Sequence, residues 1–331
     1  MLYHPRNNLR LSWLGVDMWH RAGYAGQGMK FCVVDADTDT RLARYPEKIH
    51  TYKDSGRTDW TKNHGGHGLL TIDIIQQICP ESEIYFAGWQ YSLTDCVHWA
   101  ISNDVDITTV SLGYSWQSVT RQVSQEAIDS GMLLFTSAGN AGDLPEDLIG
   151  YPARKGTWIA VGAAIVNHWG TKPERVVYSS TGQELEVMGM THLFCTLPAP
   201  YGDYIYTGTS CASPCLASII GLMEQQHGDY TKAEIRELFE TLCVDMQEPG
   251  RDRKTGWGMF RMPHPETGER MKEIVLQIDN QTVHIDGETT TIDTPPIIHN
   301  NRTMVPLSFI GRQLGASVEW NAETRQVRIR G

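Results

Sequence analysis

The chain has 331 residues, enough for one large domain and a small one. Its 28 basic and 39 acidic side chains leave a net charge of −11 with histidine neutral, which argues against nucleic acid or an anionic membrane as the main partner. No apolar run approaches the roughly 18 residues that a membrane-spanning helix needs.

Seven cysteines, odd in number and scattered mostly through apolar segments, predict buried reduced thiols rather than a disulfide framework. The N-terminal residues lack the basic, apolar and small-residue order of a signal peptide. We therefore expect a cytoplasmic protein, and a secreted or cell-surface protein after loss of a leader is the alternative.

Short apolar runs alternate with helical patterns as far as residue 262. Buried strands are predicted at 29–34, 82–87, 106–113, 132–136 and 157–162, and helices at 11–22, 69–75, 95–102, 123–130 and 233–244. Such alternation predicts a three-layer α/β fold with a mainly parallel central sheet flanked by helices.

The composition changes after residue 263. We predict an α/β domain over residues 1–263, a linker over 264–272, and a small α+β domain over 273–331. The small domain is expected to contain strands at 274–278, 282–285, 317–320 and 326–330 and one helix at 308–315. It carries no catalytic constellation of its own.

A serine begins the apolar helix predicted after Gly208. Pro214 suits a first helical turn, and apolar residues recur at helical spacing as far as Met223. Ser210 would therefore lie at the positive end of a buried helix, which favours a nucleophile whose reaction develops negative charge. The simpler alternative is that Ser210 only caps the helix.

Two other polar side chains lie at the ends of buried elements. Asp35 ends the strand at 29–34, where catalytic groups lie in open α/β sheets. His64 precedes the helix at 69–75; together with His67 it has the spacing of two metal ligands, but no third ligand motif accompanies them. A histidine can take the proton of a serine, a buried carboxylate can orient that histidine, and Asn140 is a candidate donor to the oxyanion.

Five motifs, in order, resemble those of the subtilisin-like serine proteases, the peptidase S8 family. They are Val33-Val-Asp-Ala-Asp-Thr-Asp39, His64-Gly-Gly-His67, Ser111-Leu-Gly113, Ser137-Ala-Gly-Asn140 and Gly208-Thr-Ser-Cys-Ala-Ser-Pro214. The resemblance covers roughly residues 8–262 and implies a serine endopeptidase that acts on proteins or peptides through an acyl-enzyme. It implies a triad of Asp35, His64 and Ser210, with Asn140 in the oxyanion hole.

The resemblance also implies how substrate is bound. It assigns contacts with the substrate backbone to Ser111, Leu112 and Gly113. The pocket for the residue before the scissile bond would have an uncharged wall at Ser137, Ala138 and Gly139 and a roomy base at Gly150. We therefore predict a preference for large apolar or aromatic residues at that position.

Several departures from the family pattern are visible. Asp37 stands where the family has glycine, Gly66 where it has threonine, and Leu70 where glycine is usual. These changes motivate an alternative function: a catalytically weak or silent scaffold that presents the C-terminal domain to a partner. A thiol-dependent or metal-dependent enzyme is a third, weaker alternative.

We expect no cofactor and no catalytic metal. The family's calcium loop after the histidine helix looks deleted, and Asp37 and Asp39 are expected to be solvated or to cap a turn, although calcium at a non-catalytic site stays possible. Cys211 is expected to be a packing residue, and zinc on Cys211 and Cys215 would need two more ligands.

The C-terminal segment resembles the small stalk-like domains first named after the N-terminus of copper amine oxidase. Asn301–Leu307 and Leu314–Trp320 carry that likeness, and no cluster of copper ligands accompanies it. We expect this domain to mediate protein interaction, oligomerisation or covering of the active site.

Overall fold

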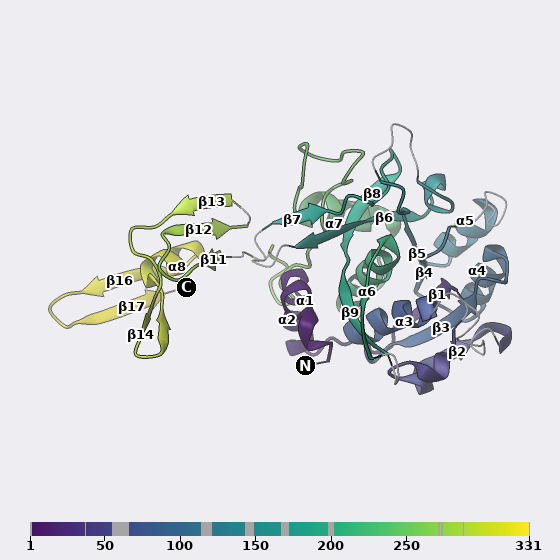
Figure 1. The fold of residues 1–331 in the computed structure, drawn as a ribbon, viewed down its shortest axis with the longest axis horizontal. Helices are drawn as coiled ribbons and strands as arrows, with labels where there is room; N and C mark the ends of the chain where they lie inside the picture. The colour runs from purple at the N-terminus through teal and green to yellow at the C-terminus, as the bar shows by residue number, and fades with distance from the viewer. Residues whose placement is uncertain are drawn as a thin grey trace. The chain divides into compact units, whose positions relative to one another are not determined.

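The computed structural model describes residues 2–36, 38–54, 66–113, 121–142, 149–166, 172–197, 202–270, 272, 274–286 and 288–330. The chain separates into two compact units (Figure 1). The larger holds Met1–Ile165 and Pro173–Arg270, and the smaller consists mainly of Met271–Gly331. Among the described residues, no helix is both long and apolar enough to cross a bilayer.

In the described part of the larger unit, eight strands form the central sheet (Figure 1). They are β1 (Lys30–Asp35), β2 (Ile49–Thr51), β3 (Glu83–Gly88), β4 (Ile107–Val110), β5 (Leu133–Ser137), β6 (Ile159–Val166), β7 (Pro173–Arg175) and β8 (Leu185–Met190). Their order is β2-β3-β1-β4-β5-β6-β7, and β8 also pairs with β6. Strand β1 runs parallel to β3 and β4, and β6 runs parallel to β5 and β8. The predicted mainly parallel sheet is confirmed.

Helices cover both faces of this sheet. Strand β1 alternates between them: the ring of Phe31 lies against Gly221 of α6 (Thr209–His227), whereas Cys32 and Val34 belong to the core beside α4 (Leu93–Ser102) and α5 (Arg121–Asp129). Helix α3 (His67–Ile78) packs beside α6 and on β1. Helix α7 (Lys232–Leu242) follows α6 along the chain. The predicted three-layer fold is therefore confirmed.

The predicted helix at 11–22 is two helices. α1 (Asn8–Leu14) ends at Gly15, whose φ of 94° is left-handed, and α2 (Val16–Arg21) begins directly after it. The apolar residues that suggested one helix are buried on both sides of this break. Apolar spacing thus identifies the buried face, but it does not show that a glycine interrupts the helix.

Helix α6 is preceded by a two-stranded antiparallel ribbon. It pairs β9 (Leu193–Leu197) with β10 (Gly202–Tyr206), so Tyr206 faces Leu193 where the ribbon ends. The sequence pattern predicts neither of these strands, nor β2, β7 and β8. Tyr206 is 3% exposed, whereas Tyr204 on the same strand is 53% exposed.

All seven cysteines are buried and none forms a disulfide, as predicted. They lie in six places of the larger unit: on β1, at the end of α3, on α4, on β9, on α6 and just after α7. Burial raises the pKa of the Cys96 and Cys211 thiols to about 12. Such thiols are poor nucleophiles at neutral pH.

The smaller unit is antiparallel. It contains the three-stranded sheet β11 (Ile274–Leu276), β12 (Thr282–Ile285) and β13 (Glu288–Thr291), then the hairpins β14 (Ile297–His299) with β15 (Arg302–Met304) and β16 (Ser317–Asn321) with β17 (Gln326–Arg330). Helix α8 (Leu307–Gln313) packs through Gly311 against Val318 of β16. The predicted α+β character is confirmed, although β14 and β15 have no counterpart in the sequence prediction.

Candidate active site

Three adjacent strands carry predicted site residues to one edge of the sheet. Asp35 is the last residue of β1, Ser111 follows β4, and Ser137 is the last residue of β5. Because β1, β4 and β5 are neighbours and parallel, their carboxyl ends meet at the same edge. Ligands and catalytic groups in open α/β sheets lie at this edge.

The carboxylate of Asp35 holds an imidazole. Asp35 is fully buried, and its Oδ1 accepts hydrogen bonds from Nδ1 of His67, at 2.5 Å, and from the backbone N–H of Ala36, at 2.6 Å. Burial by itself would lower the pKa of His67, but the charge of Asp35 and this hydrogen bond outweigh burial, so the pKa lies above its ordinary value. The carboxylate fixes the tautomer: Nδ1 carries a proton, and Nε2 is the basic nitrogen.

The histidine predicted for this position, His64, lies outside the described residues. The structure instead places His67 on Asp35, as the first residue of α3. Gly68 explains how this helix start comes so close to β1: a Cβ at Gly68 would lie 2.5 Å from the carbonyl oxygen of Ala36. The sequence contains the pair His-Gly twice, at 64–65 and at 67–68. The second pair stands directly before the apolar run of the helix. This position is the sequence signal that could have identified His67 as the partner of Asp35.

Two residues missed by sequence reasoning complete the surroundings of Asp35. Thr71, one turn along α3 from His67, donates its hydroxyl to Oδ2 of Asp35 at 2.6 Å. The hydroxyl of Tyr206 lies 2.9 Å from Oγ1 of Thr71 and 3.3 Å from Nε2 of His67. Neither a threonine inside an apolar helix nor a tyrosine before a glycine turn marks such a role in the sequence.

Ser210 lies in the first turn of α6, as predicted. It is 9% exposed, and its backbone N–H occupies a helix position that has no intrahelical acceptor. Its Oγ donates to the carbonyl oxygen of Ser111 at 3.0 Å, and Oγ of Ser111 donates to the carbonyl oxygen of Ser210 at 3.0 Å. Ser210 is not the residue that caps α6, because Gly208 occupies that position.

Asn140 is oriented by the turn that carries Ser210. Its Oδ1 accepts from the backbone N–H of Thr209, at 2.9 Å, and from the Thr209 hydroxyl, at 3.1 Å. The amide nitrogen of Asn140, which is the donor of this side chain, therefore points away from Thr209. Gly208 is held in turn by Tyr178, whose hydroxyl accepts from the Gly208 N–H at 2.9 Å, and by Thr191, whose hydroxyl donates to the Gly208 carbonyl at 3.0 Å.

Two of the segments predicted to bind substrate lie at this edge: 111–113 follows β4, and 137–139 begins with the last residue of β5. Leu112 is half-buried and Gly113 is exposed, while Ala138 is buried between the half-buried Ser137 and Gly139. Gly150 is exposed, and a Cβ built on it would meet no atom within 4 Å. The Ser137–Gly139 segment is uncharged.

Possible cation ligands near the site have other partners. Asp39 caps a short 3-10 helix and forms an ion pair with Arg41, which confirms its predicted capping role; Asp37 lies outside the described residues. Within the described ranges, no group of three or more His, Cys, Asp or Glu side chains is arranged to hold a metal ion. Cys211 and Cys215 are buried, and burial raises the pKa of both thiols.

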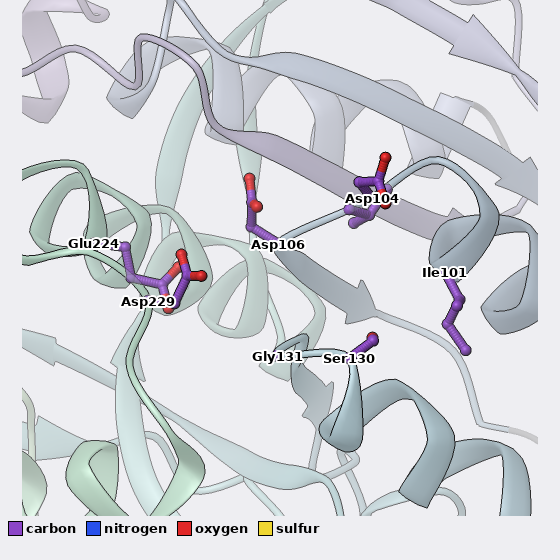
Figure 2. Close-up of a pocket in the computed structure, with 8 residues that line it drawn as sticks. Ile101, Asp104, Asp106, Ser130, Gly131, Glu224 and Asp229 are labelled. Carbon is purple, nitrogen blue, oxygen red and sulfur yellow. The ribbon is translucent and has the colours of Figure 1, made fainter.

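A separate acidic cavity of about 200 Å³ lies elsewhere in the larger unit. Figure 2 shows Asp104, Asp106, Glu224 and Asp229 around it; Glu224 comes from the last turn of α6, whereas Ser210 lies in the first. Burial, reinforced by Asp106 and Asp229, raises the pKa of Glu224 to about 8. This cavity contains none of the residues predicted for catalysis.

An imidazole on a buried carboxylate, together with a serine at a helix start, is the arrangement typical of serine hydrolases. Residues 26–258 match the profile of the subtilase family, described as Peptidase_S8. The chain therefore belongs to the subtilase family. Residues 267–329 separately match the copper amine oxidase N-terminal domain.

Named relatives are bacterial subtilisins. The chain is 31% identical to subtilisin of Bacillus pumilus over 252 residues, which cover 68% of this chain and 87% of that protein. It is 30% identical to subtilisin amylosacchariticus of Bacillus subtilis subsp. amylosacchariticus, over 68% of this chain and 63% of that protein. The chain thus spans less than two thirds of the length of some of these relatives.

Solved structures share the fold. A lanthipeptide protease superposes with a TM-score of 0.62 at 19% identity, over 78% of this chain and 94% of that one. Fervidolysin from Fervidobacterium pennivorans superposes with a TM-score of 0.61 at 19% identity, over 76% of this chain and 44% of that one. At this identity the likeness concerns the fold alone.

Proposed function

We propose that the chain is a serine endopeptidase in which Asp35, His67 and Ser210 form the catalytic triad. The observation that carries the proposal is the contact between the buried Asp35 carboxylate and Nδ1 of His67. Family membership and the position of Ser210 at the start of α6 support it.

In this mechanism, Nε2 of His67 takes the proton of Ser210 as Oγ attacks the scissile carbonyl carbon. Asp35 stabilises the resulting imidazolium and stays ionised. The proton then passes from Nε2 to the leaving amine, and an acyl-enzyme on Ser210 remains. Water, activated by the same nitrogen, releases the acyl group and restores the serine.

The tetrahedral intermediates carry an oxyanion. The amide of Asn140 and the backbone N–H of Ser210 are the proposed donors, since Oδ1 of Asn140 is already occupied by Thr209 and the Ser210 N–H has no partner within its helix. The positive end of α6 adds to this stabilisation.

The proposed partners of the substrate backbone are Ser111, Leu112 and Gly113. Open space at Gly150 and the uncharged segment Ser137–Gly139 support a preference for large apolar or aromatic side chains before the scissile bond. Cleavage rates on peptides varied at that one position test the preference. Faster cleavage after arginine or lysine than after phenylalanine or leucine would contradict it.

The triad is tested with a fluorophosphonate probe, which labels activated serines. We expect the chain to be labelled and Ser210→Ala to abolish labelling. His67→Gln should slow labelling by at least about 10³-fold, because it removes the base. The matched control is His64→Gln, expected to stay within about threefold of the original rate, since an exchange outside the triad leaves the base in place. Slow labelling of His64→Gln together with a nearly unchanged rate for His67→Gln would identify His64 as the base instead.

The alternative function, a catalytically silent scaffold, has a distinct outcome in the same experiment. A folded chain that reacts with the probe at no serine would overturn the peptidase proposal. Circular dichroism of the same sample establishes that the chain is folded.

A further inference from the structure

Four contacts link Asp35, His67, Tyr206 and Thr71 into a closed ring. Nδ1 of His67 lies 2.5 Å from Oδ1 of Asp35, and Oγ1 of Thr71 lies 2.6 Å from Oδ2. The Tyr206 hydroxyl closes the ring by contacting both Thr71, at 2.9 Å, and Nε2 of His67, at 3.3 Å. The two aromatic rings meet edge to face, with an interplanar angle of 90°.

The number of hydrogen atoms available decides which charge state of His67 fits this ring. Each contact needs one hydrogen, so the four contacts need four. The Asp35 carboxylate has none, and Thr71 and Tyr206 supply one each. A neutral His67 adds one, which leaves one contact without a hydrogen, whereas an imidazolium adds two and fills all four.

Only one direction of donation satisfies every contact. Thr71 donates to Asp35, so its oxygen must accept from Tyr206. The single hydrogen of Tyr206 is then used, and its oxygen can only accept from His67. Nε2–H of the imidazolium is the donor that this oxygen requires.

Ser210 lies outside the ring. Its Oγ donates to the carbonyl oxygen of Ser111, and in the described part of the chain no hydrogen bond joins it to His67. The Tyr206 hydroxyl therefore contacts Nε2 of His67, which is the nitrogen that must accept the serine proton in the proposed mechanism.

We infer that Tyr206 is a positioning residue: its oxygen holds the Nε2–H of protonated His67, and it thereby sets the pH range in which His67 acts as a base. This inference rests on the proposed function and deepens it. Nε2 must leave Tyr206 before it can accept a proton from Ser210, so the substrate-free enzyme rests in a state biased towards the imidazolium.

The electrostatic surroundings agree with this direction. The pKa of His67 is raised by Asp35 despite burial. Burial, with Asp35 next in size, raises the pKa of Tyr206 well above its usual value, so its hydroxyl keeps its proton. Besides Asp35, the titratable groups that act on Tyr206 among the described residues are the thiols of Cys195 on β9 and Cys211 on α6.

The test is a titration of His67 by nitrogen-15 NMR in the full chain, with its resonances assigned from the His67→Gln spectrum. Tyr206→Phe keeps the ring but removes the hydroxyl. It should lower the pKa of His67 by about 1, since a hydrogen bond to a charged group is lost. The matched control is Tyr204→Phe, which removes a hydroxyl from the exposed tyrosine of the same strand and should leave that pKa unchanged. Thr71→Ser keeps the ring of hydrogen bonds and should behave like the original chain.

An unchanged His67 pKa in folded Tyr206→Phe would overturn the inference. If Tyr206→Phe does not fold, the original chain decides: below the pKa of His67, its Nε2–H resonance should show a cross-peak to the ring protons of Tyr206, and absence of that cross-peak overturns the inference.

Activity provides a second readout. In the pH profile of the fluorophosphonate labelling rate, the acid limb should move to lower pH by about 1 in Tyr206→Phe. At a given pH on that limb, labelling becomes up to about tenfold faster. An acid limb that stays in place would contradict the inference. If Ser210 is labelled in no variant, the proposed function fails, whereas the NMR titration still judges the role of Tyr206.

Discussion

Replacing Glu224 by glutamine should stabilise the protein most at alkaline pH. Glu224 is 4% exposed, its Oε1 accepts the backbone N–H of Tyr230 at 3.2 Å, and its Oε2 has no hydrogen-bond partner among the described residues. Burial raises its pKa from 4.5 to about 8, and the neighbouring carboxylates of Asp106 and Asp229 act in the same direction (Figure 2).

The sign follows from proton binding. Between pH 4.5 and 8 the folded chain keeps the Glu224 proton and the unfolded chain loses it, so this group stabilises less and less as pH rises through that window. Each pH unit costs about 1.4 kcal/mol. From pH 5.5 to the folded pKa near 8, the expected loss is about 3 kcal/mol. Glutamine cannot ionise, so the free energy of unfolding of Glu224→Gln does not include this decrease as the pH rises.

Urea unfolding at pH 5.5 and pH 8.5 measures the effect. The free energy of unfolding of Glu224→Gln, relative to the original chain, should rise by about 3 kcal/mol between the two pH values. Glu240→Gln, an exchange at an exposed glutamate of α7, is the matched control and should show no such rise. Equal differences at both pH values for Glu224→Gln would refute the proposal that this carboxyl is protonated in the folded chain at neutral pH.

Three further exchanges act on the site itself. Gly68→Ala places a Cβ 2.5 Å from the Ala36 carbonyl, so we expect at least about tenfold slower fluorophosphonate labelling and a loss of about 1–3 kcal/mol in urea unfolding; a variant with the original values would contradict this close packing. Asn140→Ala should lower kcat by about 10²–10³ with KM little changed, a range that comes from subtilisin rather than from this geometry, and an unchanged kcat would exclude Asn140 from the oxyanion hole. Tyr178→Phe removes the acceptor of the Gly208 N–H and should cost about 1 kcal/mol in urea unfolding and slow labelling; unchanged labelling would show that Ser210 does not need this support.

The sequence predicts the frame of the larger unit well because its strands are buried on both faces. Continuous apolar runs such as 29–34 and 132–136 have no solvent-facing pattern, and they match β1 and β5 within about one residue. Among the strands that are missed, β9 alternates buried and more exposed positions but over only five residues, and β10 has four exposed residues before Tyr206. Such a short strand and such an exposed one leave little periodicity to detect.

The site is predictable where one backbone feature fixes one side chain. Asp35 ends a strand, and Ser210 follows a glycine turn into a helix, so both positions follow from element boundaries. The histidine is different, because two His-Gly pairs lie three residues apart and only the exact start of α3 distinguishes them. Helix boundaries are the least certain part of a sequence prediction. Thr71 and Tyr206 meet across 135 positions of the chain, and only tertiary packing brings them together.

The buried thiols offer a way to observe the larger unit opening. We expect a thiol reagent to reach Cys32 only when the central sheet separates, Cys96 only when α4 moves away from the sheet, and Cys211 only when the first turn of α6 opens. No cysteine follows Cys243, so reagent uptake reports on the larger unit alone. Timed exposure to such a reagent, read by mass spectrometry of peptides, would rank these regions by the free energy needed to open each one.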